Sequence, residues 1–131
     1  MEIDKNTIVK KIRQLGKSRV KFITLFGSYA KGTSTSRSDI DIAVFYDGNE
    51  KERFNFRIFV GANFPDRYDI QIFQDLPLYV KQEIFKYGKV IYGKDSKEVY
   101  ECCFSTIKEY ERMKKFYEMY YERFGEQIAK V

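Results

Sequence analysis

The stretch LFGSYAKGTSTSRSDIDIAVF, residues 25–45, decides the fold that this sequence implies. Gly27 and Ser28 come first, and ten residues separate them from Asp39 and Asp41. Glycine permits a sharp turn and a close approach of the backbone to a ligand. The stretch therefore predicts a turn that can hold phosphate, followed by two carboxylates that point the same way.

The two aspartates are expected on one face of a strand. Residues 39–45 alternate in the manner of a strand, and their apolar face consists of Ile40, Ile42 and Val44. Asp39 and Asp41 would then lie roughly 6–7 Å apart along the strand, close enough for both carboxylates to reach shared metal ions. Oxygen ligands of this kind suit Mg²⁺ or Mn²⁺. Two solvated acids at a strand end are the alternative interpretation of the pair alone.

The residues around Gly27 predict a strand, a turn and a short helix. Residues 21–25, KFITL, have the composition of a strand, and the glycine follows. Ser28 lies where a helix over residues 29–31 begins, and backbone N–H groups at such a position attract phosphate. The same residues could form an ordinary strand-to-helix turn with serine as N-cap. The aspartates downstream favour the phosphate-binding interpretation.

A third carboxylate, Asp69, lies in the segment RYDIQIF at residues 67–73. This segment also alternates as a strand, with Asp69 opposite the apolar face formed by Tyr68, Ile70 and Ile72. If the two aspartate strands pair, Asp69 can accept a proton from an incoming hydroxyl or help to bind the metal. A solvated strand aspartate after a turn is the alternative.

With these residues in place, the chain resembles the nucleotidyltransferases of the DNA polymerase beta superfamily. Their signature is a Gly-Ser pair, a short spacer, an Asp-x-Asp pair and a later acidic residue, matched here by Gly27, Ser28, Asp39, Asp41 and Asp69. GSYAKG followed by SDIDIAV is most similar to the minimal nucleotidyltransferase (MNT) group, whose members are often antitoxin partners of HEPN-domain toxins. The resemblance covers residues 20–93. Lys31 departs from it, since relatives often carry arginine there.

The resemblance implies both a fold and a reaction. The fold is of the α+β class, a small mixed β-sheet flanked by helices with a long C-terminal helix. The reaction moves AMP from ATP, or from another nucleoside triphosphate, to a hydroxyl, with two Mg²⁺ ions (or Mn²⁺) as cofactors. Catalysis and metal binding would fall to Asp39, Asp41 and Asp69, and nucleotide binding to Gly27, Ser28 and Lys31.

Chain length bears on the acceptor. At 131 residues we expect a single domain, with a core over residues 20–93 and a C-terminal helix over residues 96–125. Larger family members add a domain that binds the acceptor, for which this length leaves no room. The acceptor is therefore expected on a partner such as a HEPN toxin, or at a site completed in a homo-oligomer. A small-molecule nucleotidyltransferase and a non-catalytic binding antitoxin are the alternatives.

Composition excludes several classes of site and partner. The chain contains no histidine, so histidine-based acid–base catalysis and most zinc sites are excluded. The net charge of +5 comes from basic residues scattered along the sequence, and no nucleic-acid partner is expected. Two adjacent cysteines, Cys102 and Cys103, are interpreted as helix residues in a reducing compartment. With no signal peptide or long apolar run, we expect a cytoplasmic protein.

Apolar spacing places the remaining elements. Helices are expected over residues 2–15, 50–62, 77–87 and 96–125, and a short strand over residues 89–92. The buried rows of the first two helices are predicted to be Ile8, Ile12 and Leu15, and Phe54, Ile58 and Ala62. The last helix is rich in tyrosine and phenylalanine, and its far half is expected to extend beyond the body toward a partner or a second copy.

Overall fold

The computed structural model describes residues 4–35 and 38–129, with side chains up to residue 125. In chain order the elements are α1 (Lys5–Gly16), η1 (Lys17–Arg19), β1 (Val20–Phe26), α2 (Ser28–Lys31), β2 (Ile40–Tyr46), α3 (Glu50–Ala62), β3 (Tyr68–Ile72), η2 (Phe73–Asp75), α4 (Leu78–Tyr87), β4 (Lys89–Tyr92) and α5 (Lys97–Ala129). The expected α+β class is confirmed.

The strands form one mixed sheet in the order β3-β2-β1-β4. β1 is antiparallel to both β2 and β4, and β2 is parallel to β3. The register aligns Asp41 with Phe26 on one side and with Asp69 on the other. Because β1 ends where β2 and β3 begin, the turn after β1 meets the two aspartates at one end of the sheet.

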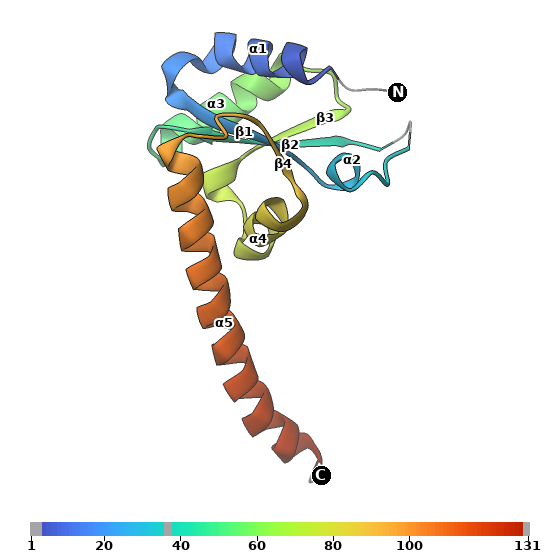
Figure 1. The fold of residues 1–131 in the computed structure, drawn as a ribbon, viewed down its shortest axis with the longest axis vertical. Helices are drawn as coiled ribbons and strands as arrows, with labels where there is room; N and C mark the ends of the chain where they lie inside the picture. Colours follow the sequence, from blue (N-terminus) through green and yellow to red (C-terminus); the bar gives the residue numbers. More distant parts are fainter. Residues whose placement is uncertain (1–3, 36–37, 130–131) are drawn as a thin grey trace.

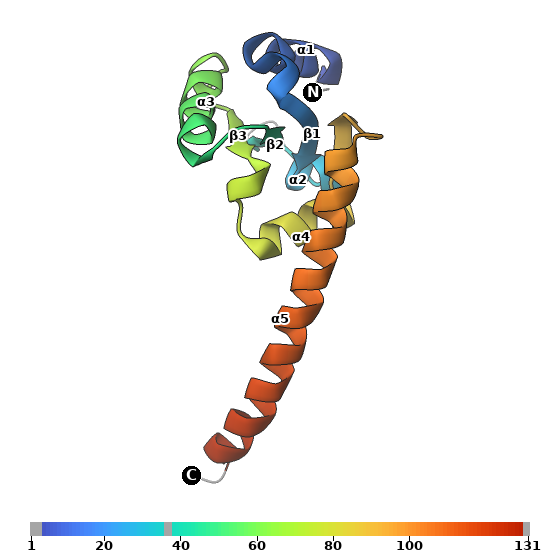
Figure 2. The same cartoon turned by 90° about the vertical axis from the view of Figure 1, so that its left-hand side faces the viewer.

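Helices cover both faces of the sheet, as Figures 1 and 2 show. On one face α1 and α3 enclose the larger core, which buries the alternating row of β2 formed by Ile40, Ile42 and Val44. On the other face, residues of α4 and of the start of α5 contact a smaller core that includes Phe22, Ala43 and Phe73. Asp41 precedes Ala43 by two residues, so it lies on the α4 face of the sheet.

Element boundaries follow local signals closely. α3 has the expected bounds because Asn49 and Glu52 form a capping box at its start. α1 begins at Lys5, after the N-cap Asp4, and the expected start at residue 2 lies outside the described residues. Asp39 precedes β2 rather than lying in it, and Pro77 caps α4 from outside the helix.

The buried face of α3 differs from the predicted one. Phe54 and Ile58 are 59% and 54% exposed, so the prediction that they face the core is wrong. Phe56 and Val60, which have the same spacing, are buried instead. The Phe56 ring stacks on Tyr46 of β2 with centroids 4.1 Å apart. Two rows with equal spacing compete in this helix, and contact with the sheet selects one.

The last helix is longer than expected and only partly attached. Val99 and Thr106 in its first turns are buried. Beyond Met113 each side chain described on α5 is exposed, and Figures 1 and 2 show this half projecting from the body as expected. In the part of the chain with described structure, no helix is sufficiently long and apolar to traverse a membrane.

Candidate nucleotidyl-transfer site

The turn after β1 is built around Gly27. Its φ of +71° lies in the left-handed region, which side-chain-bearing residues rarely adopt. A Cβ at this position would collide with Oδ2 of Asp41. The glycine therefore allows the chain to turn into α2, and it leaves the space that the Asp41 carboxylate occupies.

Asp41 is the half-buried carboxylate of the site. Burial raises its pKa to about 6, and the charges of Asp69 and Asp39 and a hydrogen bond with Asp69 act in the same direction. Each of these causes disfavours the ionised form of Asp41. The fold thus gathers negative charge at this end of the sheet, where a cation would relieve the repulsion.

Asp69 is reached by a chain of hydrogen bonds from α3. Arg57 Nη1 donates to Gln71 Oε1 at 3.1 Å, and Gln71 Nε2 donates to Asp69 Oδ1 at 2.8 Å. Because Arg57 binds the amide oxygen of Gln71, the amide N–H groups are the ones that face Asp69. The exposed Asp69 carboxylate is therefore oriented as a hydrogen-bond acceptor, which is the state that a proton-accepting group requires.

Asp39 is exposed and lies one residue before β2. The segment that carries it is tied to the residue before β3, because Arg67 Nε donates to the Ser38 carbonyl at 3.1 Å. The Ile40 N–H in turn donates to the Arg67 carbonyl at 2.9 Å. The Arg67 guanidinium lies 5.4 Å from the ring centroid of Tyr29 in α2. Arg67 therefore connects the helix after Gly27 to the start of the aspartate strands.

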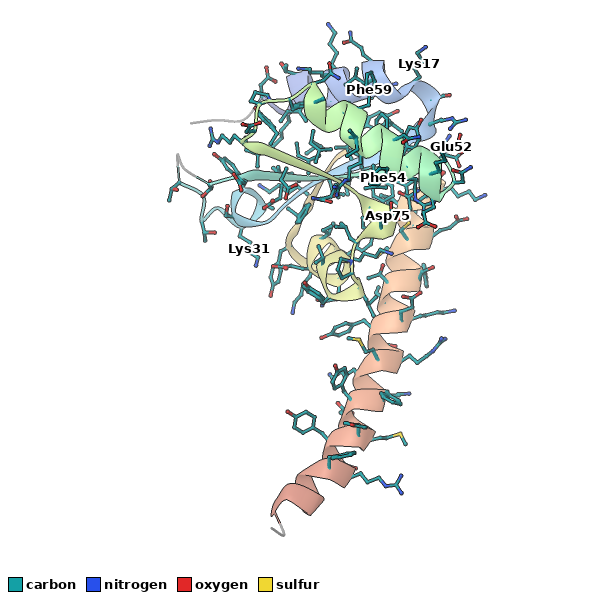
Figure 3. All side chains as sticks on the ribbon, turned by 180° about the vertical axis from the view of Figure 1, so that it is seen from behind. Lys17, Lys31, Glu52, Phe54, Phe59 and Asp75 are labelled. Atoms are coloured by element: carbon teal, nitrogen blue, oxygen red, sulfur yellow. The ribbon has the colours of Figure 1, made fainter. Side chains whose placement is uncertain are left out.

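Ser28 and Lys31 are the first and last residues of α2. Ser28 is half-buried and directly follows Gly27. Lys31 forms an ion pair with Glu83 of α4, and its Nζ lies 5.1 Å from the ring centroid of Tyr87. Figure 3 shows Lys31 extending from α2 on the side of the sheet where α4 lies. A phosphate bound by Lys31 would have to compete with Glu83.

The carboxylates of the site are the type of ligand that a hard divalent cation binds, but they are not arranged around a single point. Carboxylate oxygens are the ligands that Mg²⁺ prefers, and Asp41 is hydrogen-bonded to Asp69 and influenced by the charge of Asp39. Among the side chains described over residues 4–35 and 38–125, however, no three from His, Cys, Asp or Glu are grouped so that they could hold a metal ion. The three predicted carboxylates are brought to one end of the sheet without converging on one point.

Sequence reasoning missed Arg57, Gln71 and Glu83. Gln71 carried a usable signal, because it lies two residues after Asp69 and so shares its strand face. The other two act across elements: Arg57 is 14 residues from Gln71, and Glu83 is 52 residues from Lys31. No local sequence pattern predicts a contact between residues so far apart in the chain.

Comparison with known proteins agrees with this construction. Residues 7–97 match the family model described as "Polymerase beta, Nucleotidyltransferase". A Methanocaldococcus jannaschii protein named "Putative protein adenylyltransferase" is 41% identical over 98 residues, which are 75% of each chain. A second protein of that name from the same organism is 54% identical over 39 residues, 30% of this chain and 39% of its own.

Solved structures share the fold. A chain of a crystal structure described as a toxin–antitoxin with AMP-PNP has a TM-score of 0.73 at 23% identity, covering 92% of this chain and 97% of its own. A chain of a structure of tri-AMPylated Shewanella oneidensis HEPN toxin in complex with MNT antitoxin has a TM-score of 0.66 at 21% identity, covering 90% and 92%. At these identities the likeness concerns the fold alone.

The family match spans most of the chain, and it includes Gly27, Asp41 and Asp69. The 41% identity over three quarters of the length supports it at the level of sequence. The resemblance inferred from the motif is confirmed, together with the expectation of an enzyme that transfers nucleotides. The chain belongs to the polymerase beta nucleotidyltransferase family.

Proposed function

We propose that this chain transfers AMP from ATP to a hydroxyl of a partner protein, and that the partner is a HEPN-type toxin which the transfer neutralises. The main observation behind the proposal is the end of the sheet where Gly27, in a left-handed conformation, lies against Asp41, which is beside Asp69. The relative named as a protein adenylyltransferase supports the reaction. The fold shared with chains from toxin–antitoxin structures supports the class of partner.

The donor would be held at the turn after β1. Following the family pattern, Gly27 and Ser28 would bind the β- and γ-phosphates, and the absence of a side chain at Gly27 leaves the backbone accessible. Lys31 would exchange its ion pair with Glu83 for one with a phosphate. Asp39, Asp41 and Asp69, which do not converge on one point in this structure, are the carboxylates that would draw together to hold a divalent cation. Such a cation would lower the pKa of a bound hydroxyl and neutralise the charge of the leaving group.

Asp69 is the proposed acceptor of the hydroxyl proton. As the acceptor oxygen forms its bond to the α-phosphorus, the bond from that phosphorus to the β-phosphate oxygen breaks and pyrophosphate leaves. The hydroxyl proton then passes to a carboxylate. Gln71 orients Asp69 as a hydrogen-bond acceptor, and Arg57 keeps Gln71 in the orientation that does so.

The exposed half of α5 favours a protein as acceptor over a small molecule. Its exposed large apolar side chains are Phe116, Tyr117, Met119, Tyr120, Tyr121 and Phe124. Three of these stack along one side of the helix, with ring centroids 6.2 Å apart for Phe116 and Tyr120 and 4.5 Å apart for Tyr120 and Phe124. Aromatic residues and methionine are enriched in protein interfaces. A partner bound there would be held on the same molecule as the site, whereas a homo-oligomer would cover the same surface.

The proposal is tested by incubating the protein with ATP labelled at the α-phosphate, Mg²⁺ and the product of the adjacent gene, which is expected to be a HEPN-type protein. Label should appear on that protein, and Asp41→Asn should reduce the rate by at least about 100-fold. Asp47→Asn is the matched control, since Asp47 is exposed and directly follows β2.

Three results would contradict the proposal. Transfer that survives the double variant Asp39→Asn and Asp41→Asn would remove the catalytic assignment. Tight binding of the HEPN-type protein with no label transfer would favour a non-catalytic antitoxin, and transfer to an aminoglycoside instead would favour a small-molecule enzyme.

A further inference from the structure

A groove at the other end of β1 gathers basic side chains. It has a volume of about 880 Å³ and lies between α1 and β4, beside the first residues of β1 and α5. Its described lining includes one carboxylate, Glu98, and four cations, which are Lys10, Arg13, Lys17 and Lys21. The four cations lie within residues 10–21, and the fold places them all along this groove.

The cations come from consecutive elements. Lys10 and Arg13 lie three residues apart on α1, roughly 4.5 Å along the helix axis. Lys17 directly follows the helix, and Lys21 adds a fourth charge from β1. Within the described chain, none of the four forms an ion pair with a carboxylate. Their charge remains available to a ligand.

Lys17 lies at the rim of the groove in a conformation that favours glycine. Its φ is +54°, in the left-handed region that disfavours L side chains. The residue before Lys17 is Gly16. A Cβ at Gly16 would collide with Val20 and press on Phe56, so the backbone passes close to both side chains where α1 ends. Glycine would be the lower-energy residue at position 17, yet the turn presents a lysine side chain to the groove.

We propose that this groove binds a linear phosphate polyanion, such as a single nucleic-acid strand or inorganic polyphosphate. A cluster of four cations that form no ion pair in the described chain suits repeated phosphate charges better than one isolated anion. Tyr92, the aromatic residue of the described lining, has the Arg13 guanidinium 4.4 Å from its ring centroid. That contact leaves one face of the ring unavailable for base stacking, so recognition rests on phosphates rather than bases.

The groove is separate from the transfer site, and the proposal does not depend on nucleotidyl transfer. Val20 and Phe26 are the two ends of β1, which at strand geometry lie about 20 Å apart. Figure 3 shows Lys17 and Lys31, one from each end, on opposite sides of the body. Binding can therefore be measured in EDTA, where divalent cations do not hold phosphate at the carboxylates.

The test measures binding of the full chain to a fluorescent 12-nucleotide oligouridylate by anisotropy, in EDTA at several KCl concentrations. Three to four phosphate contacts predict a slope of log affinity against log salt of about −2 to −3. The double variant Lys10→Ala and Lys17→Ala should raise Kd at least about 10-fold and make the slope shallower by about 1.4. The matched control, Lys51→Ala and Lys108→Ala, removes the same charge from exposed positions outside the groove.

Competition and one further variant complete the test. Unlabelled polyphosphate and oligothymidylate should both displace the probe, and their relative affinities would identify the preferred source of phosphate. Lys17→Gly should weaken binding as much as Lys17→Ala while raising the melting temperature, which separates binding from folding. Equal effects of groove and control variants, or no binding at 50 mM KCl, would overturn the proposal. Displacement by polyglutamate as effective as by polyphosphate would overturn the ligand class.

Discussion

The two ends of β1 carry opposite charges on similar turns. After Phe26, the backbone turns at Gly27 with a φ of +71°, beside the carboxylates of Asp41 and Asp69. Before Val20, it turns at Lys17 with a φ of +54°, beside a basic groove. At the first turn a missing side chain makes room for a carboxylate. At the second turn, a lysine side chain is present although glycine would have the lower energy. Similar backbone geometry therefore excludes a side chain at one turn and carries a basic one at the other.

Gly27→Ala should have the largest effect on stability. The substitution combines left-handed strain with a collision against Asp41, and we expect it to lower the free energy of unfolding by about 3 kcal/mol. Gly32→Ala is the matched control, because Gly32 has a φ of +73° with nothing within 4 Å of an added Cβ. Strain alone should cost it about 1 kcal/mol in urea denaturation. Equal costs for the two variants would remove the special role of the Gly27 contact.

Asp41→Asn should stabilise the fold at neutral pH. Since the pKa of Asp41 is about 6 in the folded protein against an ordinary 3.8, the folded state binds more protons between these values. Wild-type stability should therefore fall as pH rises from about 4 to about 6 and then level off. The variant lacks this loss, so at pH 7.5 it should gain about 2 kcal/mol, less than the full shift implies because Asp41 is partly solvated.

Urea denaturation in EDTA between pH 4 and pH 8 measures this difference. The gain of the Asp41→Asn variant over wild type should be small at pH 4 and nearly complete at pH 7. A gain that does not change with pH would show that charge repulsion at this end of β1 is not its cause.

Gln71→Ala should reduce catalysis without unfolding the protein. Asp69 would lose the donor that orients it, and we expect about a 10-fold lower rate of AMP transfer with an unchanged Km for ATP. Arg57→Ala should produce a smaller loss in the same direction, because it acts through Gln71. A raised Km with an unchanged rate would place Gln71 in nucleotide binding instead.

Lys17→Gly should have the smallest effect, and of opposite sign to Gly27→Ala. Relief of left-handed strain, offset by the greater freedom of glycine in the unfolded chain, should stabilise the fold by about 0.5–1 kcal/mol. Thermal or urea denaturation would detect this gain, with Ser18→Gly as the control at a neighbouring position. A loss of stability in Lys17→Gly would show that the two turns are not comparable.

Signals within a few residues account for what the sequence predicted well. Alternation along residues 39–45 identified the buried row of β2 and the opposite face that carries Asp41, and apolar spacing identified α3 with its observed bounds. The motif from Gly27 to Asp41 identified the family, because all of its residues lie in or next to the single connection between the adjacent strands β1 and β2.

Features that depend on tertiary contact escaped prediction. In α3, the row of Phe54 and Ile58 has the same spacing as that of Phe56 and Val60, and the contact with Tyr46 decides which is buried. The pairing of Lys31 with Glu83 joins residues 52 positions apart. The positive φ of Lys17 was not predicted either, because a lysine gives no sequence signal for the left-handed conformation.

Parallel transfer assays with ATP labelled at the α- or at the γ-phosphate test the central claim most directly. They use Mg²⁺ and the product of the adjacent gene, which is expected to be a HEPN-type protein. If the carboxylate end of β1 is a nucleotidyl-transfer site, α-label should appear on the acceptor and γ-label should leave with pyrophosphate. Asp41→Asn should reduce the rate of transfer at least about 100-fold. Transfer of γ-label, or α-label transfer that Asp41→Asn leaves intact, would contradict the account.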